Sequence, residues 1–318
     1  EEGDRRDDDL SLFYLKLRNG DGRLNDIFVH RLKDKLGTRA LPTAELTLKG
    51  TPATLIGERG RGVAQISTIL NITRLYNAAA AVSFMRRGIA LAHDYAGKRR
   101  AFGKLLREQP LHAETLADLD AEHAGAFHLV FEMARLLGRD ECAEASEAEK
   151  GLLRLMTPVV KLYTAKQAIA VASEVLESFG GQGYIEDTGL PALLRNCQVL
   201  SIWEGTTNVL ALDVLRALKR PELLQYLLDD CRRRMNDACS IGDALRQRIE
   251  ILIAEMASRG EAMASMPVEQ RERGARRFAY VLARGYGAAL LAESAARTET
   301  AERDRLLELL RRWLDHPA

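Results

Sequence analysis

Two short segments, Phe179-Gly-Gly-Gln-Gly-Tyr184 and Ile202-Trp-Glu-Gly-Thr-Thr207, decide how this 318-residue sequence is interpreted. The first segment places three glycines within four residues, and such a turn lets the main chain approach a flat or charged group closely. A helix C-cap would explain one glycine but not three. The second segment places one carboxylate, Glu204, beside a glycine and just before two threonines that can cap a new helix. The pair therefore indicates a close-approach turn followed by a loop that presents an acid.

The sequence around these segments is predominantly helical in its apolar spacing. Apolar residues recur with a helical period over residues 63–92, 108–138 and 147–179, and a further helix is predicted to start at Thr206. Pro158 predicts a kink or a helix N-terminus within the third stretch. Long helices joined by short loops pack most simply as an antiparallel bundle.

The two ends of the sequence differ from this central part. Residues 10–57 favour β-strands, because 10–17 and 44–49 alternate polar and apolar residues and Asn19–Gly22 predicts a turn between strands. The Gly-rich stretch 57–62 lacks a P-loop lysine pattern, so we interpret it as a connector. After Pro221, clustered arginines alternate with leucine and alanine at helical spacing, which predicts a separate extension of three or four helices.

Composition limits the classes of function. The chain is 47% hydrophobic and 29% charged with a formal net charge of +1, so no overall field favours nucleic acid or a membrane surface. No apolar run approaches the roughly 18 residues that a membrane helix needs. The four cysteines and six histidines show no metal-ligand spacing, so no metal is expected. Cysteine usage favours an intracellular, reducing compartment, cytoplasm or mitochondrial matrix, and the sequence does not decide between them.

The segment around Glu204 resembles the acyl-CoA dehydrogenase family, in which a glutamate in a (Tyr/Trp)-Glu-Gly-Thr segment removes the α-proton of an acyl-CoA. The resemblance implies that Glu204 is the catalytic base and that FAD accepts the hydride from Cβ at flavin N5. It also implies that Trp203 and Gly205 lie against the substrate. Arg74 matches an arginine that the family places close to the base, and a buried arginine wants a carboxylate partner, for which Glu204 is a candidate.

Other motifs extend the resemblance to the FAD site. Lys98–Leu106 is similar to the family's Arg-x-x-Phe-Gly segment, which implies that Arg99 pairs with the FAD pyrophosphate and that Phe102 lies against the cofactor. A planar guanidinium suits phosphate because it donates two parallel hydrogen bonds. The glycine turn implies a contact with the FAD of a neighbouring subunit. The remaining cofactor-contacting positions implied by the resemblance are Glu177 (a glutamine in much of the family), Gly180, Gly181, Thr206 and Asn208.

The resemblance covers about residues 10–220, and it sets the predicted fold class and domains. The fold is expected to be mainly α: the second half of a β domain in residues 1–60, an antiparallel helical bundle in 61–220 and a helical extension in 221–318. Within the family, residues 32–39, residues 108–111 and the extension look most like the long-tailed branch that contains AidB. The family's N-terminal helical domain and the first half of its β domain have no counterpart, so strand edges and apolar surface should be exposed.

The same resemblance implies the partners. Medium- or long-chain acyl-CoA would be the substrate, an electron-transfer flavoprotein would reoxidise the flavin, and the N-terminal half of the same protein would complete the site. A glycine turn that contacts a neighbour's cofactor implies a homodimer or homotetramer.

Two alternatives belong to other classes of function. Members of the AidB branch are linked to nucleic-acid binding, and the clusters Arg232–Arg234 and Arg271–Arg277 would be the contact. Residues 219–318 hold 18 Lys and Arg against 16 Asp and Glu, however, and such a balance is typical of a solvated helix face with ion pairs. A protein that sequesters acyl-CoA with little turnover is the other alternative, and the presence of Glu204 argues against it.

Overall fold

The protein is described by a computed structural model that covers residues 10–299 and 301–315. The chain separates into two compact units, one up to Thr73 and one from Arg74 onward, and each is described by itself. The described residues are mainly helical, with short strands near the N-terminus, so the predicted fold class is confirmed.

The first unit contains two antiparallel strand pairs and the start of a helix. Strand β1 (Leu12–Leu15) pairs with β4 (Ala53–Ile56), and β2 (Ile27–Leu32) pairs with β3 (Ala44–Leu48). The predicted strands in this region are present, whereas the pattern did not single out β4. The connector at 57–62 leads directly into helix α1 (Gly62–Ala96), whose first residues belong to this unit.

Apolar side chains of the first unit are largely exposed. Among its described residues, Ile27 is the one hydrophobic side chain that is buried. Large apolar residues on all four strands face solvent: Phe13, Tyr14, Phe28, Val29, Leu32, Leu46, Leu48 and Ile56. The exposure of apolar side chains that the sequence predicted for this region is therefore present on the described strands.

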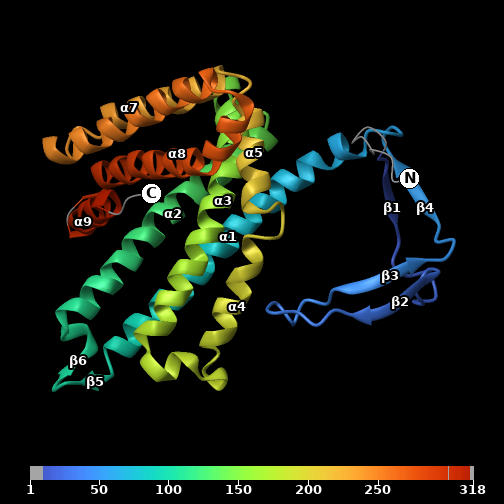
Figure 1. Ribbon diagram of the computed structural model, residues 1–318, viewed down its shortest axis with the longest axis horizontal. Helices are drawn as coiled ribbons and strands as arrows, with labels where there is room; N and C mark the ends of the chain where they lie inside the picture. The colour runs from blue at the N-terminus through green and yellow to red at the C-terminus, as the bar shows by residue number, and fades with distance from the viewer. Residues whose placement is uncertain (1–9, 300, 316–318) are drawn as a thin grey trace. The chain divides into compact units, whose positions relative to one another are not determined.

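The second unit is built around one buried helix, α3 (Glu147–Ser178), which contacts α2 (Pro110–Glu141) and four of the helices that follow it (Figure 1). A capping box opens α3: the Ser146 hydroxyl accepts a hydrogen bond from the Glu149 amide (3.2 Å), and the Glu149 carboxylate accepts one from the Ser146 amide (2.9 Å). The helix runs through Pro158 without ending, so the proline marks no helix N-terminus.

The remaining bundle helices frame the Glu204 loop. Helix α1 contributes a stripe at helical spacing to the core: Ala78, Val82, Met85, Ile89, Ala92 and Ala96. Helix α4 (Leu190–Leu200) was not predicted, while α5 (Thr207–Ala217) starts where the sequence indicated. Thr206 occupies the N-cap position of α5, but its side chain makes no capping hydrogen bond.

The extension contains four helices within the described residues: α6 (Glu222–Asp237), α7 (Asp243–Ser265), α8 (Val268–Arg297) and α9 (Ala301–Asp315). Helix α8 is the centre of this group, because it contacts α2, α3 and α5 of the bundle as well as α6, α7 and α9 (Figure 1). Trp313 of α9 is fully buried and packs where Gly125 of α2 and Gly287 of α8 leave room; a Cβ at Gly125 would lie 2.1 Å from its ring.

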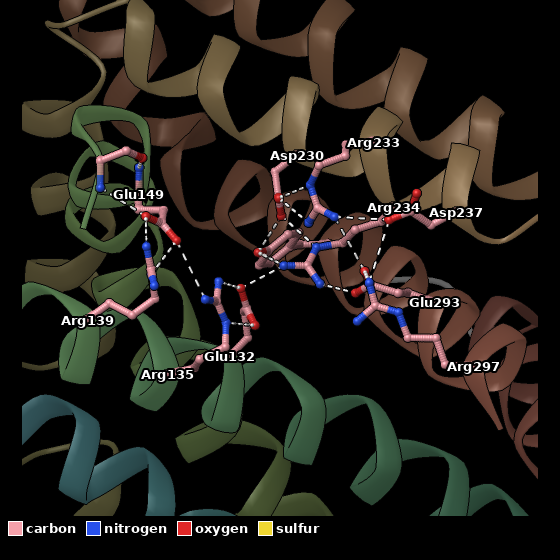
Figure 2. Close-up of polar contacts among 12 residues, drawn as sticks. Glu132, Arg135, Arg139, Glu149, Asp230, Arg233, Arg234, Asp237, Glu293 and Arg297 are labelled. Carbon is pink, nitrogen blue, oxygen red and sulfur yellow. Dashed lines mark hydrogen bonds and ion pairs between the residues drawn. The ribbon is translucent and has the colours of Figure 1, made fainter. Parts of the chain in front are cut away.

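A buried arginine, Arg234 of α6, joins the extension to the bundle (Figure 2). It is 4% exposed and donates hydrogen bonds to Glu132 of α2 (2.7 Å), to Asp230 of its own helix (2.6 Å) and to Glu293 of α8. The surrounding ion pairs extend this network outward: Arg135 and Arg139 bond Glu149, Arg233 bonds Asp230 and Asp237, and Arg297 bonds Glu293.

The same network bears on the proposed nucleic-acid contact. Arg232 pairs with Asp229 at 2.9 Å, Arg233 pairs with Asp230 at 2.7 Å, and Arg234 is buried. The cluster Arg232–Arg234 is therefore occupied by acidic neighbours, which disfavours it as a phosphate-binding surface.

Replacement of Arg234 by Met should destabilise the protein strongly, because it leaves buried carboxylates without their common cation. Breaking a buried ion pair from one side typically costs about 3–5 kcal/mol. Chemical denaturation of Arg234→Met should show a loss of this order, whereas Arg232→Met, at an exposed ion pair, should change the free energy of unfolding by less than about 1 kcal/mol. Equal losses for the two variants would contradict the assigned role.

Candidate functional site

The Glu204 loop connects α4 to α5 and has an unusual backbone. Glu204 has φ +59° and Gly205 has φ +100°, so two consecutive residues lie in the left-handed region. Glycine adopts this conformation freely, but glutamate does so at a cost of order 1–3 kcal/mol. Residues held in this way cluster at functional sites, and the surrounding structure must fix them.

Two cations, one buried and one half-buried, hold the loop through its main chain. Lys161 of α3 donates from Nζ to the Gly205 carbonyl at 2.6 Å, and Arg74 of α1 donates from Nε to the Glu204 carbonyl at 3.4 Å. Lys161 is 1% exposed. Burial lowers the pKa of Lys161 to about 8, with the charge of Arg74 acting in the same direction and the charge of Glu204 opposing it. The loop conformation therefore depends on groups from two separate helices.

The carboxylate partner of Arg74 differs from the candidate suggested by the sequence. Arg74 donates from Nη1 to Asp213 of α5 at 2.7 Å, and Arg154 of α3 donates to the other oxygen of Asp213 at 2.8 Å. Asp213 is thus the paired carboxylate, while Glu204 meets Arg74 through its main-chain oxygen.

The surface around Glu204 combines apolar and polar groups. The Glu204 side chain is half-buried, and Ile202, Trp203 and Val209 beside it are exposed. Thr206 and Asn208 are also exposed, and neither side chain makes a hydrogen bond in the part of the chain that the structure describes. The loop therefore combines Glu204 with exposed apolar residues and with two polar side chains near the N-terminus of α5 that make no hydrogen bond within the described residues.

A second group of predicted residues lines a hollow of about 430 Å³ at the C-terminal end of α3. Arg99, Glu177, Gly180 and Gly181 share this hollow with Tyr95, whose ring stacks on Phe179 at 4.5 Å between centroids. Both glycines belong to a short 3₁₀ turn (Gly180–Tyr184).

The glycines of this turn have different physical roles. Gly180 has φ +59°, whereas a Cβ on either Gly180 or Gly181 would meet nothing within 4 Å, so both main-chain segments are open to a ligand. A Cβ on Gly183 would lie 1.9 Å from the Leu176 carbonyl oxygen, so Gly183 is required by packing. The Arg99 side chain makes no ion pair or hydrogen bond within the described residues.

Phe102 lies outside this hollow, at the tip of a hairpin made by β5 (Arg100–Ala101) and β6 (Lys104–Leu105). It has φ +51° and is followed by Gly103 with φ +81°, the pattern of a type I′ turn. Its ring is 98% exposed, which is unusual for a phenylalanine held in a strained conformation. This ring is available to a ligand or to a second protein surface.

Comparison with known proteins identifies relatives over both helical parts of the chain. The profile "Acyl-CoA dehydrogenase, C-terminal domain" matches residues 60–219, and "Acyl-CoA dehydrogenase 11 C-terminal domain-like" matches residues 224–317. The chain belongs to the acyl-CoA dehydrogenase family.

Individual relatives place the chain within this family more closely. It is 45% identical to "Acyl-CoA dehydrogenase family member 11" of Caenorhabditis elegans over 97% of this chain and 51% of that protein. It is 36% identical to "Putative acyl-CoA dehydrogenase AidB" of Escherichia coli over 70% of this chain and 40% of that protein. The crystal structure of C. elegans ACDH-11 in complex with C11-CoA superposes with a TM-score of 0.92 and 43% identity, over 96% of this chain and 53% of that one. The chain spans about half the length of these relatives.

The sequence did not single out three residues that the structure places at the Glu204 loop or in the Arg99 hollow, namely Lys161, Asp213 and Tyr95. Lys161 carried a signal, because it is a single charge within the apolar run Val159-Val160-Lys161-Leu162, and a buried lysine needs a specific partner. The described residues hold no cluster of three or more side chains suited to a metal ion. They also contain no helix long and apolar enough to cross a membrane.

Replacement of Lys161 by Met should loosen the Glu204 loop, since the Gly205 carbonyl loses its charged donor. Trp203 reports on this loop, and the other tryptophan, Trp313, is buried and should stay constant. Acrylamide quenching of Trp203 should increase in Lys161→Met and stay unchanged in Lys166→Met, a control on the same helix.

The pH dependence gives this prediction a second readout. In the parent protein, quenching should increase as pH rises through about 8, where Lys161 loses its charge. Because its folded pKa lies below the unfolded value of about 10.4, its contribution to the free energy of unfolding should rise between these two pH values. Both effects should vanish in Lys161→Met, and their persistence would contradict the assignment.

Proposed function

We propose that the protein catalyses FAD-dependent α,β-dehydrogenation of a medium- or long-chain acyl-CoA, with Glu204 as the base. The observation that supports this most strongly is the left-handed Glu204–Gly205 loop, held by Lys161 and Arg74 through main-chain oxygens. The loop stores strain to present one carboxylate, and the family uses a glutamate in this segment to remove a proton.

The role of Glu204 follows from the demands of the reaction. The α-proton of a thioester is weakly acidic, so its removal needs a carboxylate fixed at hydrogen-bond distance, and such positioned bases contribute typically 10²–10⁴-fold to rate. Trp203 and Gly205, which flank Glu204 in the chain, are proposed to lie against the acyl group. Gly205 has φ +100°, and a Cβ there would lie 3.2 Å from the Leu210 side chain, so the loop needs a glycine at this position. Arg74 serves the site by positioning the loop and by pairing with Asp213.

The available residues fit FAD in two places. Thr206 and Asn208 offer unpartnered polar side chains at the N-terminus of α5, where the helix dipole favours an electron-rich ring. Arg99, Gly180 and Gly181 offer an unpaired guanidinium and open main chain, which suit a diphosphate. When bound, FAD would supply the hydride acceptor, at flavin N5.

The partners follow from the same arrangement. The Arg99 hollow and the exposed Phe102 are proposed to serve the FAD of a neighbouring copy, which requires a homodimer or homotetramer. The exposed strands of the first unit are proposed to pack against the N-terminal half of the protein, and an electron-transfer flavoprotein is proposed to reoxidise the flavin. The C11-CoA bound by ACDH-11 supports a medium- or long-chain acyl group. We also propose that the chain comprises three domains: part of a β domain in residues 1–60, a helical bundle in 61–220 and a helical extension in 221–318.

Replacement of Glu204 by Gln tests the proposed reaction. Acyl-CoA added anaerobically to the FAD-loaded protein should bleach the flavin band in the parent, and the rate of bleaching should fall by about 10²–10⁴-fold in Glu204→Gln. Acyl-CoA affinity should remain, because glutamine keeps the shape of the side chain. The control Glu174→Gln changes a carboxylate on α3, outside the Glu204 loop.

The same titration separates the alternatives. Bleaching that persists in Glu204→Gln would remove the base assignment. Tight acyl-CoA binding without bleaching in the parent protein would replace the enzyme by a sequestering protein.

Replacement of Arg99 by Gln tests the cofactor site. The variant should weaken FAD binding by about 10- to 100-fold, the loss expected for one charge-assisted hydrogen bond to phosphate. Arg100→Gln is the matched control, because Arg100 is adjacent and exposed but its guanidinium faces the Gly103 carbonyl at 3.4 Å. Flavin fluorescence during reconstitution measures both affinities, and equal affinities would contradict the role of Arg99.

A further inference from the structure

A second hollow, of about 530 Å³, lies where the end of α5 meets α6, α7 and the start of α8. Residues 212–219 on one wall belong to the first matched domain, and residues 224–272 on the others belong to the second. None of the proposed catalytic or FAD-binding residues lines it. Its volume falls within the roughly 300–1,000 Å³ typical of small-molecule sites.

The walls of this hollow are largely apolar, and one of them carries small residues. The lining includes side chains from all four helices: Leu212, Leu215, Leu218, Leu224, Leu228, Met263 and Val268. Ala257, Gly260 and Ala264 of α7 are spaced so that they share one helix face. A Cβ on Gly260 would lie 2.2 Å from the Leu224 side chain, so Gly260 is required by the packing of α7 against α6, and Ala257 and Ala264 line the hollow with small side chains. The hollow therefore suits a narrow apolar ligand.

Three cations without partners also line the hollow. Arg216 and Lys219 are three positions apart at the end of α5, and Arg271 lies in the first turn of α8. None of their side chains makes an ion pair or hydrogen bond in the described part of the chain, whereas the nearby Arg220 pairs with Glu222 at 2.8 Å.

The balance of charge at this opening favours an anion. Glu261 and Glu272 also line the hollow, so three cations and two carboxylates leave a net charge of +1. The N-terminus of α8, which begins at Val268 on the rim, adds the positive end of a 30-residue helix. An anionic head group at this opening would be stabilised by the unpaired cations and by the helix dipole of α8.

We propose that this hollow binds a single-chain amphiphile with a carboxylate head, that is, a long-chain fatty acid. The chain lies among the leucines against Ala257, Gly260 and Ala264, and the carboxylate accepts hydrogen bonds from Arg216 and Lys219. This site does not depend on the proposed dehydrogenase activity, because it shares no lining residue with the Glu204 loop.

Calorimetric titration of the purified protein with dodecanoate, below its micelle concentration, tests the site. One saturable event per chain is expected. Decanoate should bind about tenfold or more weakly, since each buried methylene strengthens binding by about fourfold. Dodecyltrimethylammonium should bind at least tenfold more weakly than dodecanoate. Absence of saturable dodecanoate binding, or equal binding of the cationic amphiphile, would overturn the proposal.

Variants assign this binding to the hollow. Ala264→Phe fills the recess from an exposed position, and Arg216→Gln with Lys219→Gln removes the head-group contacts; each should weaken dodecanoate binding by at least tenfold. Arg273→Gln with Arg276→Gln, two exposed and unpaired arginines of α8 that do not line the hollow, should leave it unchanged. Unchanged binding in either pocket variant overturns the assignment, and a change of oligomeric state in Ala264→Phe without loss of binding identifies the groove as a protein interface instead.

Discussion

The paired carboxylate of Asp213 is the interaction on which the arrangement of the site depends. Its two oxygens accept hydrogen bonds from Arg74 of α1 and Arg154 of α3, and Asp213 itself belongs to α5. Buried charges are costly unless they are paired, so the three helices must keep the relative positions that bring these groups together. Those positions also bring Lys161 and Arg74 beneath the loop that carries Glu204. One ion cluster thereby fixes the helices and the backbone strain between them.

The extension is joined to the bundle by a buried cation that bonds several carboxylates, the reverse of the arrangement at Asp213. Arg234 is a single buried cation that bonds carboxylates on α2, α6 and α8, whereas Asp213 is a carboxylate that bonds two cations. Arg284 adds a third centre, with Glu122 and Tyr163 on one side and the Trp313 ring on the other. Leucine- and alanine-rich helices can slide against one another with little change in buried area. A buried charge with partners on separate helices removes that freedom.

The long helices could be predicted from sequence because their apolar period persists over many turns, as in 108–138 against the observed Pro110–Glu141. Helix α4 was missed because it has 11 residues and opens with Gly189-Leu-Pro191, which reads locally as a turn. The partner of Arg74 was wrong for another reason: Asp213 lies 139 positions away, and several carboxylates are equally plausible without coordinates. Thr206 was correctly placed at the start of α5, yet its hydroxyl makes no cap, which only the side-chain geometry reveals. Helices can therefore be predicted from the local apolar period, whereas the arrangement of the site depends on pairs of charges that are distant in the sequence.

Helix α5 gives the two halves of the second unit a common mechanical element. Its N-terminus follows the Glu204 loop, Asp213 anchors its middle, and Leu212, Leu215 and Arg216 on it line the hollow shared with the extension. An 11-residue helix is stiff over its length, so a change in packing at one end must be absorbed by rotation or translation of the whole element. Asp213 resists such movement because its two arginines lie on different helices. The contact of the extension with the end of α5 and the Glu204 loop therefore lie on one helix, with the Asp213 ion cluster between them.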